Sequence, residues 1–198
     1  MPEFAGQRAK AHDCSIESAL AALTLPSYRD LKAQIQTYLL KQNADMGTHN
    51  NVYKILRANA DNDVFTISLG PRFDKGPDDS HFYLESGSRL SFGITVRGSN
   101  AGCSLLEYRF QLSLPDSHTP QFYRFDLNDK AHETPLHEPR CHLHPGTDKV
   151  RLPCPVFTPL EIRDRIFLVI EPQTGATLAT PPSDPAKPVS RPPQEANR

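Results

Sequence analysis

The chain has 198 residues, of which 37% are hydrophobic and 23% charged, and this length suits one domain of ordinary size. Its 22 basic and 23 acidic residues leave a net charge of −1. That balance excludes a strongly basic nucleic-acid-binding protein and an acidic disordered chain. The 19 prolines and 8 histidines are unusual counts, and their positions divide the chain into regions.

The N-terminal part is predicted to be helical after a short flexible start. Residues 1–12 are polar and lack the apolar core of a signal peptide. Residues 15–23 and 28–41 have the spacing of two helices separated by Pro26, and Ser27 suits the N-cap of the second. The apolar side chains of the second helix form one stripe, which predicts that it packs against a sheet.

The middle of the chain reads as strands. Apolar and polar residues alternate in four segments, 65–69, 90–96, 108–114 and 122–127, and more weakly in a fifth, 52–57. Alternation of this kind predicts one buried and one wet face, which is typical of an antiparallel sheet. We therefore expect an α+β fold with four to five antiparallel strands, two N-terminal helices and one C-terminal helix.

The C-terminal helix has a clear start and a clear end. Thr158 and Glu161 form a capping box around Pro159 at the first helical position, and Pro172 stops the helix. Residues 171–198 contain seven prolines and no apolar periodicity, so we predict a disordered tail there. Residues 13–170 are then expected to form a single α+β domain.

Two further features concern the compartment of the protein. No apolar run approaches the roughly 20 residues that a membrane span needs, so no membrane association is expected. The cysteines Cys14, Cys103, Cys141 and Cys154 have no spacing typical of a secreted disulfide framework. We therefore predict a cytoplasmic protein with reduced thiols, and we favour buried, inert cysteines over a catalytic cysteine.

Five of the eight histidines lie between positions 118 and 144, and the sharpest feature among them is the pair His142 and His144. On an extended segment both imidazoles point to the same side. Such a pair suits acid–base chemistry, because imidazole titrates near neutral pH, or metal ligation. The metal alternative needs more ligands, with Cys141, Cys154, His132 and His137 as candidates. None of the established metal-site spacings is present, and alternation puts Cys141 on the opposite face from His142. We therefore expect chemistry without a metal or other cofactor.

Arginines accompany this histidine pair. Arg109 and Arg124 fall on the polar phase of their predicted strands, and Arg140 and Arg151 flank the histidine segment. Guanidinium groups bind phosphate in a bidentate manner and stabilise charge that develops during its transfer. Combined with two imidazoles, they suit RNA cleavage, in which the 2′-hydroxyl of the substrate is the nucleophile. The alternative is that these arginines are ordinary solvated partners of nearby acidic residues.

Part of the chain resembles a known family. The resemblance rests on Phe122-Tyr123-Arg124-Phe125-Asp126, on His132, and on Pro139-Arg140-Cys141-His142-Leu143-His144. These segments look like the TumE family of toxins from bacterial toxin–antitoxin pairs, over about residues 84–170. The resemblance implies a toxin-like cytoplasmic protein with an antitoxin protein as partner and RNA as target. Cys141 and Leu143 depart from the family, which tends to have a basic residue or histidine and a lysine there.

The leading hypothesis is thus an RNA-binding protein or ribonuclease that needs no metal. In it His142 and His144 supply the acid and base, and Asp126 orients a histidine or an arginine. Phosphate contacts are assigned to four arginines, namely Arg109, Arg124, Arg140 and Arg151. The rival hypothesis is a non-catalytic protein-interaction module of a bacterial or phage defence system, in which the histidines are structural or bind metal.

Overall fold

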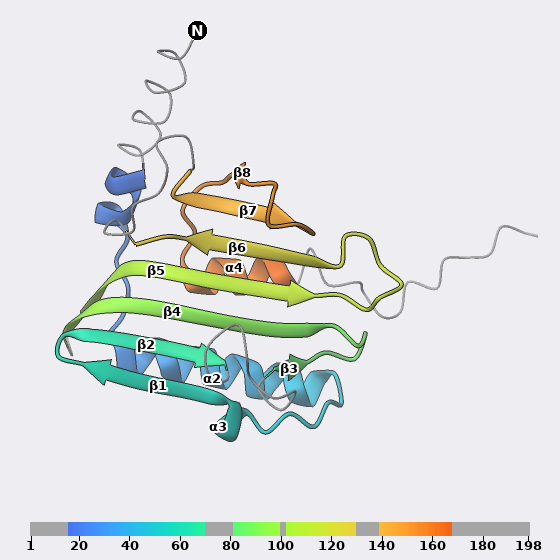
Figure 1. The fold of residues 1–198 in the computed structure, drawn as a ribbon. Coiled ribbons are helices and arrows are strands. Elements are labelled where there is room, and N and C mark those ends of the chain that lie inside the picture. The colour runs from blue at the N-terminus through green and yellow to red at the C-terminus, as the bar shows by residue number, and fades with distance from the viewer. Residues whose placement is uncertain (1–15, 70–80, 100–101, 130–138, 168–198) are drawn as a thin grey trace, which may run out of the picture.

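The computed structural model describes residues 16–69, 81–99, 102–129 and 139–167. The flexible start predicted for residues 1–12 and the disordered tail predicted for 171–198 lie outside these residues. Figure 1 shows a broad antiparallel sheet with helices behind it. The α+β class predicted from the sequence is confirmed.

The sheet has eight strands, all paired antiparallel, in the order β1-β2-β4-β5-β6-β7-β8 with the short β3 beside β4. Their bounds are β1 Leu56–Asp61, β2 Val64–Leu69, β3 Phe82–Tyr83, β4 Arg89–Ser99, β5 Gly102–Ser113, β6 Phe122–Leu127, β7 Cys141–Pro145 and β8 Leu152–Pro153. Apart from β3, each strand pairs with its neighbour along the chain, so the sheet is a meander.

The prediction of four to five strands was too small. β1 contains few apolar residues and is largely exposed at the sheet edge, so alternation did not mark it clearly. β3 and β8 have two residues each, which is too short for any pattern. β7 lies within a proline-rich stretch for which the sequence predicts only an extended segment around His142 and His144. The fifth predicted segment, 52–57, was also wrong in part, because Val52–Ile55 is the short helix α3 and β1 begins only at Leu56.

The helices begin where the sequence predicts. Residues 16–22 are helical, and α2 spans Tyr28–Asp45, four residues beyond the predicted end. The Ser27 hydroxyl accepts a hydrogen bond from the Asp30 amide at 3.2 Å, which satisfies one of the free donors at the start of α2. The helix α4, Pro159–Arg165, starts with the predicted capping box, in which both hydrogen bonds between Thr158 and Glu161 are formed.

Helices α2 and α4 cover one face of the sheet, which is named the apolar face here. Helix α2 buries Leu31, Ile35 and Leu39, and the core they join is built from the inward side chains of β2, β4, β5 and β6. The two helices also touch each other, because the Arg163 guanidinium of α4 lies 3.9 Å from the ring centroid of Tyr38 on α2. Their shared position explains why the apolar phase of each strand is buried.

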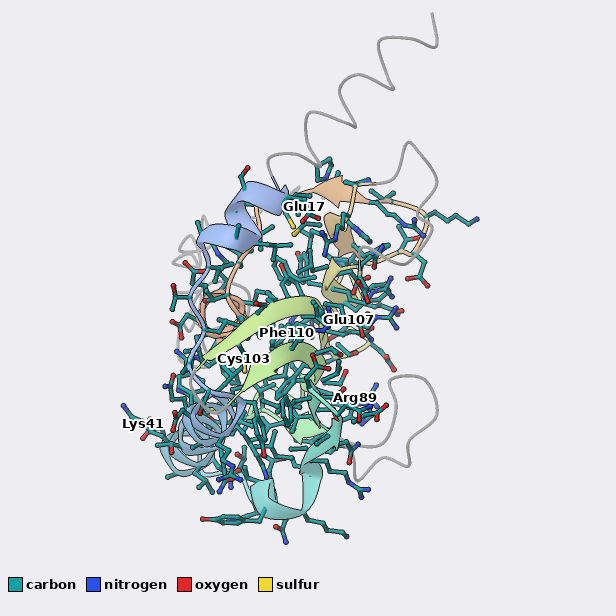
Figure 2. All side chains as sticks on the ribbon, turned by 90° about the vertical axis from the view of Figure 1, so that its left-hand side faces the viewer. Glu17, Lys41, Arg89, Cys103, Glu107 and Phe110 are labelled. Atoms are coloured by element: carbon teal, nitrogen blue, oxygen red, sulfur yellow. The ribbon has the colours of Figure 1, made fainter. Side chains whose placement is uncertain are left out.

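The opposite side of the sheet, named the polar face, carries the other phase of each strand. In the view of Figure 2, Arg89 of β4 and Glu107 of β5 lie toward the right, away from helix α2, and Lys41 of α2 lies at the left. Two successive residues of β5 illustrate the alternation, because Phe110 is buried and Arg109 is partly exposed. Among the described residues, no helix is long and apolar enough to cross a membrane.

Candidate functional site

The pairing register brings the predicted site residues together on the polar face. Arg109 of β5 lies directly opposite Asp126 of β6, which lies directly opposite His142 of β7. Two residues away on each strand, and therefore on the same face, Arg124 of β6 lies opposite His144 of β7. Directly opposite residues point to the same side of a sheet, so all five side chains share the polar face.

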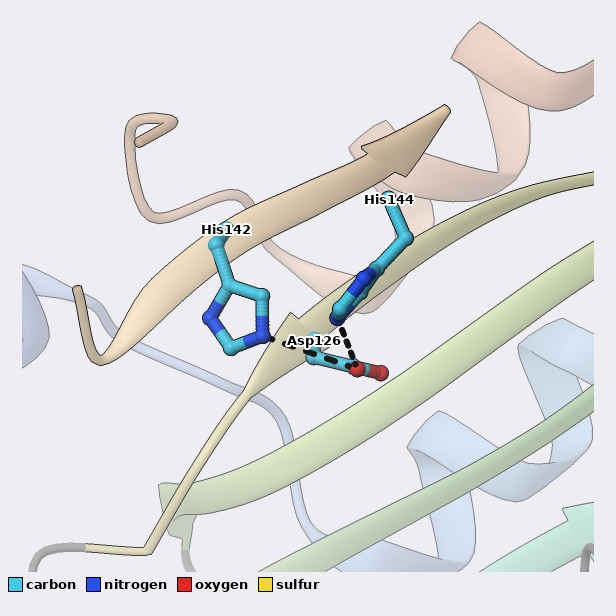
Figure 3. Close-up of side chains that lie close together, drawn as sticks. All are labelled: Asp126, His142 and His144. Atoms are coloured by element: carbon cyan, nitrogen blue, oxygen red, sulfur yellow. Dashed lines mark ion pairs between the residues drawn. The ribbon is translucent and has the colours of Figure 1, made fainter. Parts of the chain in front are cut away.

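Asp126, His142 and His144, called the trio below, form the centre of this group. The Nε2 atom of His144 lies 3.3 Å from Oδ2 of Asp126, and the Nε2 atom of His142 lies 3.7 Å from the same oxygen. Figure 3 shows both imidazole rings directed at this carboxylate. The side chains are 5%, 3% and 1% exposed for Asp126, His142 and His144, so the trio is almost fully removed from water.

The backbone decides which ring nitrogen of each histidine carries a hydrogen. Nδ1 of His142 lies 2.7 Å from the carbonyl oxygen of Pro139, and Nδ1 of His144 lies 3.2 Å from that of Thr147. A carbonyl oxygen can only accept, so each Nδ1 is a donor. In a neutral imidazole the Nε2 atom then carries a lone pair, and in both rings this atom faces Asp126.

Two arginines flank the carboxylate of Asp126. The Nε of Arg124 donates to Oδ2 at 2.8 Å, and its Nη1 reaches the exposed Asp148 at 2.6 Å. The Nε of Arg109 lies 3.4 Å from Oδ1, outside good hydrogen-bond geometry. Within the described part of the chain, the buried Oδ1 accepts no hydrogen bond. The carboxylate therefore has unused acceptor capacity at a buried position.

Asp126 is the member of the trio that lines a cavity on the polar face, and neither histidine is among the lining residues. This cavity has a volume of about 200 Å³, and its lining includes Gly93, Glu107, Arg109 and Asp126. Gly93 of β4 lies opposite Arg109, so one member of this row of residues has no side chain. The open space beside Arg109 and Asp126 gives a small ligand a place to approach them.

The burial of His142 has an electrostatic consequence. Removal of the ring from water lowers its pKa, because the charged imidazolium loses hydration. The Pro139 carbonyl and the Asp126 carboxylate oppose this effect but do not cancel it. The neutral form of His142, with its Nε2 lone pair toward Asp126, is therefore favoured near neutral pH.

One of the four predicted phosphate-binding arginines, Arg140, has its guanidinium bound outside this group. Arg140 forms an ion pair with Glu17 of the N-terminal helical segment, and its Nε donates to the carbonyl oxygen of Asn128 at 2.7 Å. These contacts tie β7 to the rest of the fold and occupy the guanidinium. Arg151 is half-buried at the residue before β8. His132 and His137, two of the clustered histidines, lie outside the described residues.

The thiols lie on the other side of β7, as alternation predicts. The Sγ of Cys141 is 3.4 Å from the Tyr108 hydroxyl and 3.3 Å from the Sγ of Cys154, all within the core. The hydrogen bond from the Cys154 thiol lowers the pKa of Cys141, although burial acts in the opposite direction. Cys103, Cys141 and Cys154 are free thiols, so neither member of the close pair is cross-linked.

The sequence predicts His142, His144 and Asp126 as site residues, but it does not show that their possible metal-ligand atoms meet at one point. Asp126 was expected only to orient a neighbour, whereas one of its oxygens faces both Nε2 atoms. Asp126, His142 and His144 each offer a donor atom, and these atoms lie within 4.8 Å of one another. The cavity lining at Gly93 and Glu107 was also missed, since it depends on which strands become neighbours.

Comparisons of this chain with protein-family models, with curated proteins and with solved structures return no match.

Proposed function

We propose that this protein binds RNA and cleaves its phosphodiester bonds at the trio, with Arg109 and Arg124 as phosphate-binding groups. The observation that carries the proposal is the row in which Arg109, Asp126 and His142 stand side by side, with Arg109 and Asp126 lining a cavity. Guanidinium, carboxylate and imidazole groups in contact are the groups that acid–base cleavage of a phosphodiester needs.

The chemistry requires no external nucleophile. The 2′-hydroxyl of RNA loses its proton to a base, and its oxygen forms a bond to the adjacent phosphorus. The bond from phosphorus to the 5′-oxygen breaks, and that oxygen takes up a proton from an acid. A guanidinium beside the phosphate stabilises the charge that builds up on its oxygens. Arg109, which is 40% exposed, is the arginine best placed to meet a ligand in the cavity.

The resemblance to the TumE toxins supports RNA as the substrate class and adds an antitoxin protein as the partner. The RNA substrate and the antitoxin partner are both part of the proposal. The net charge of −1 argues against general affinity for polyanions, so RNA contact would be confined to the local surface around Arg109.

The test is the decay of RNA incubated with the purified full-length protein. General acid–base groups contribute roughly 10²–10⁴-fold to such reactions, and we expect His144→Ala to lower the rate within that range. Arg109→Ala should slow cleavage and weaken RNA binding. Arg97→Ala is the matched control, because Arg97 lies on the same face of β4 but pairs with Asp63 at 3.5 Å, away from the trio. Equal RNA decay with wild type and His144→Ala, or none with either, would refute the proposal.

A second candidate is the non-catalytic interaction module, and the burial of the trio favours it. Side chains that are 1–5% exposed can serve as a polar network that fixes the pairing of β6 and β7. On this alternative the RNA assay is negative, and variants of the trio alter stability alone. The same set of proteins therefore separates the two candidates.

A further inference from the structure

We infer that the trio is a binding site for a divalent zinc-type metal ion, with one carboxylate oxygen of Asp126 and the Nε2 atoms of His142 and His144 as ligands. The inference concerns the site of the proposed function, but it stands whether or not the protein cleaves RNA. It departs from the sequence-based expectation of a site without metal.

The first step is the direction of the lone pairs. Both Nδ1 atoms must donate, because each lies against a backbone carbonyl oxygen, at Pro139 and Thr147. Each neutral ring therefore presents the Nε2 lone pair to the Asp126 carboxylate, which is itself an acceptor. Three acceptor atoms converge on one point, and a cation between them satisfies all three.

The second step is distance. Zinc bonds of about 2.0–2.2 Å place the ligands of a tetrahedral ion roughly 3.4 Å from one another. The separations from Asp126 Oδ2 are 3.3 Å to His144 Nε2 and 3.7 Å to His142 Nε2, on either side of that value. The donor atoms of the three residues all lie within 4.8 Å of each other. Small rotations of the side chains would complete the geometry.

The third step is the unused acceptor on the carboxylate. Oδ1 of Asp126 is buried, lies 3.4 Å from the Arg109 Nε and accepts no hydrogen bond from any described residue, whereas Oδ2 faces both imidazoles and accepts from Arg124 at 2.8 Å. A buried carboxylate with one oxygen lacking a hydrogen bond is costly, and a cation bound by this carboxylate would offset that cost. Arg124 fixes the orientation of the carboxylate as an outer partner, in the way that ligands of metal ions are commonly supported.

The fourth step is charge. Around the cavity and the trio, the carboxylates of Glu107, Asp126 and Asp148 face the guanidiniums of Arg109 and Arg124. An imidazole binds a metal in its neutral form, and with both rings in that form the three carboxylates outnumber the two guanidiniums, which suits a cation. A bound divalent ion reverses the sign, and the same cavity then attracts a phosphate group.

The donor set indicates the class of ion. Two imidazoles and a carboxylate bind zinc and other first-row divalent ions in preference to magnesium or calcium, which take oxygen ligands. The hydrogen bonds from each Nδ1 to a backbone carbonyl are the usual support of such ligands. Three protein ligands leave a position open for water, which is characteristic of catalytic rather than structural zinc sites.

The test is zinc titration of the full-length protein after treatment with chelator, followed by calorimetry and by the melting temperature. We expect one equivalent to bind and the melting temperature to rise. Asp126→Asn and His144→Gln keep the side-chain volume. Each should weaken binding by more than the roughly 10–100-fold that follows loss of an outer hydrogen bond.

Two controls address other ligands. His49→Gln removes an exposed histidine, and Cys154→Ser removes a thiol of the core pair, and both should still bind one equivalent. Cobalt in place of zinc offers a readout on the wild-type protein alone, because its visible absorption distinguishes nitrogen and oxygen ligands from thiolates. A spectrum without thiolate bands is the expected result.

The outcomes separate this inference from the proposed function. No stoichiometric zinc binding by the wild-type protein, or binding unchanged in both Asp126→Asn and His144→Gln, would overturn the metal site. RNA decay measured in chelator and after zinc loading is scored separately. Zinc binding without RNA decay supports the metal site and refutes the ribonuclease. RNA decay without zinc binding supports the ribonuclease and refutes the metal site.

Discussion

The two faces of this sheet are made by the same strands but hold together in different ways. On the apolar face, Phe92 and Phe110 stack with ring centroids 5.2 Å apart among many equivalent neighbours, and packing is shared by the whole core. On the polar face, the trio depends on three donor groups that meet at one point. The first arrangement tolerates exchange of one apolar residue for another of similar volume, whereas the second tolerates almost no change of chemistry.

The largest difference is expected for neighbouring residues of β5. Phe110→Ala removes a buried ring and should lower the free energy of unfolding by about 3–5 kcal/mol. Gln111→Ala, one residue on and on the polar face, should change it by less than about 0.5 kcal/mol. Urea denaturation of both variants measures this. Similar losses in the two would mean that the faces are not distinct in stability.

The next difference concerns the two carboxylates that share Arg124. In chelator, Asp126→Ala should destabilise the protein by about 3 kcal/mol, because it leaves buried positive charge without its partner. Asp148, whose side chain is 74% exposed, binds the same guanidinium, but Asp148→Ala should cost less than about 1 kcal/mol. The comparison uses denaturant midpoints at equal pH. A larger effect at Asp148 would contradict the burial argument.

The smallest expected effect is that of a variant in the helix cap of α4, and it tests whether the apolar and polar faces are independent. Thr158→Ala removes the cap of α4 and should cost about 1 kcal/mol, whereas Thr158→Ser keeps the hydroxyl and should cost little. Because α4 lies on the apolar face, zinc binding at the trio should be unchanged in the folded protein. Thermal unfolding and zinc titration of the same samples measure both quantities. Weaker zinc binding in Thr158→Ala would show that the faces are coupled.

The apolar face could be predicted from the sequence because burial follows from local patterns. Alternation marked β2, β4, β5 and β6, and the capping residues marked the starts of α2 and α4. The strands that escaped prediction are exposed, short or poor in apolar residues. β1 is exposed at an edge, and β7 presents two histidines and a cysteine where apolar residues usually stand.

The polar face could be predicted only in part, because its geometry depends on register. The spacing of His142 and His144 fixes their common side, but their position opposite Asp126 follows from the pairing of β6 with β7. No local pattern reports which residues of two strands become partners. Arg140 illustrates the same limit. It lies beside the histidine pair in sequence, yet its guanidinium pairs with Glu17, more than a hundred residues away in the chain.

The way in which β6 and β7 are joined bears on how such a site would vary among proteins. The Asn128 amide donates to the Arg140 carbonyl oxygen at 3.0 Å, so the ladder between the strands closes before the connection begins. Insertions or deletions in that connection leave Asp126 paired with His142, because this pairing is set by the register of the two strands. A distant homologue with this centre would therefore share two short signatures, Arg-x-Asp and His-x-His, separated by a gap of any length.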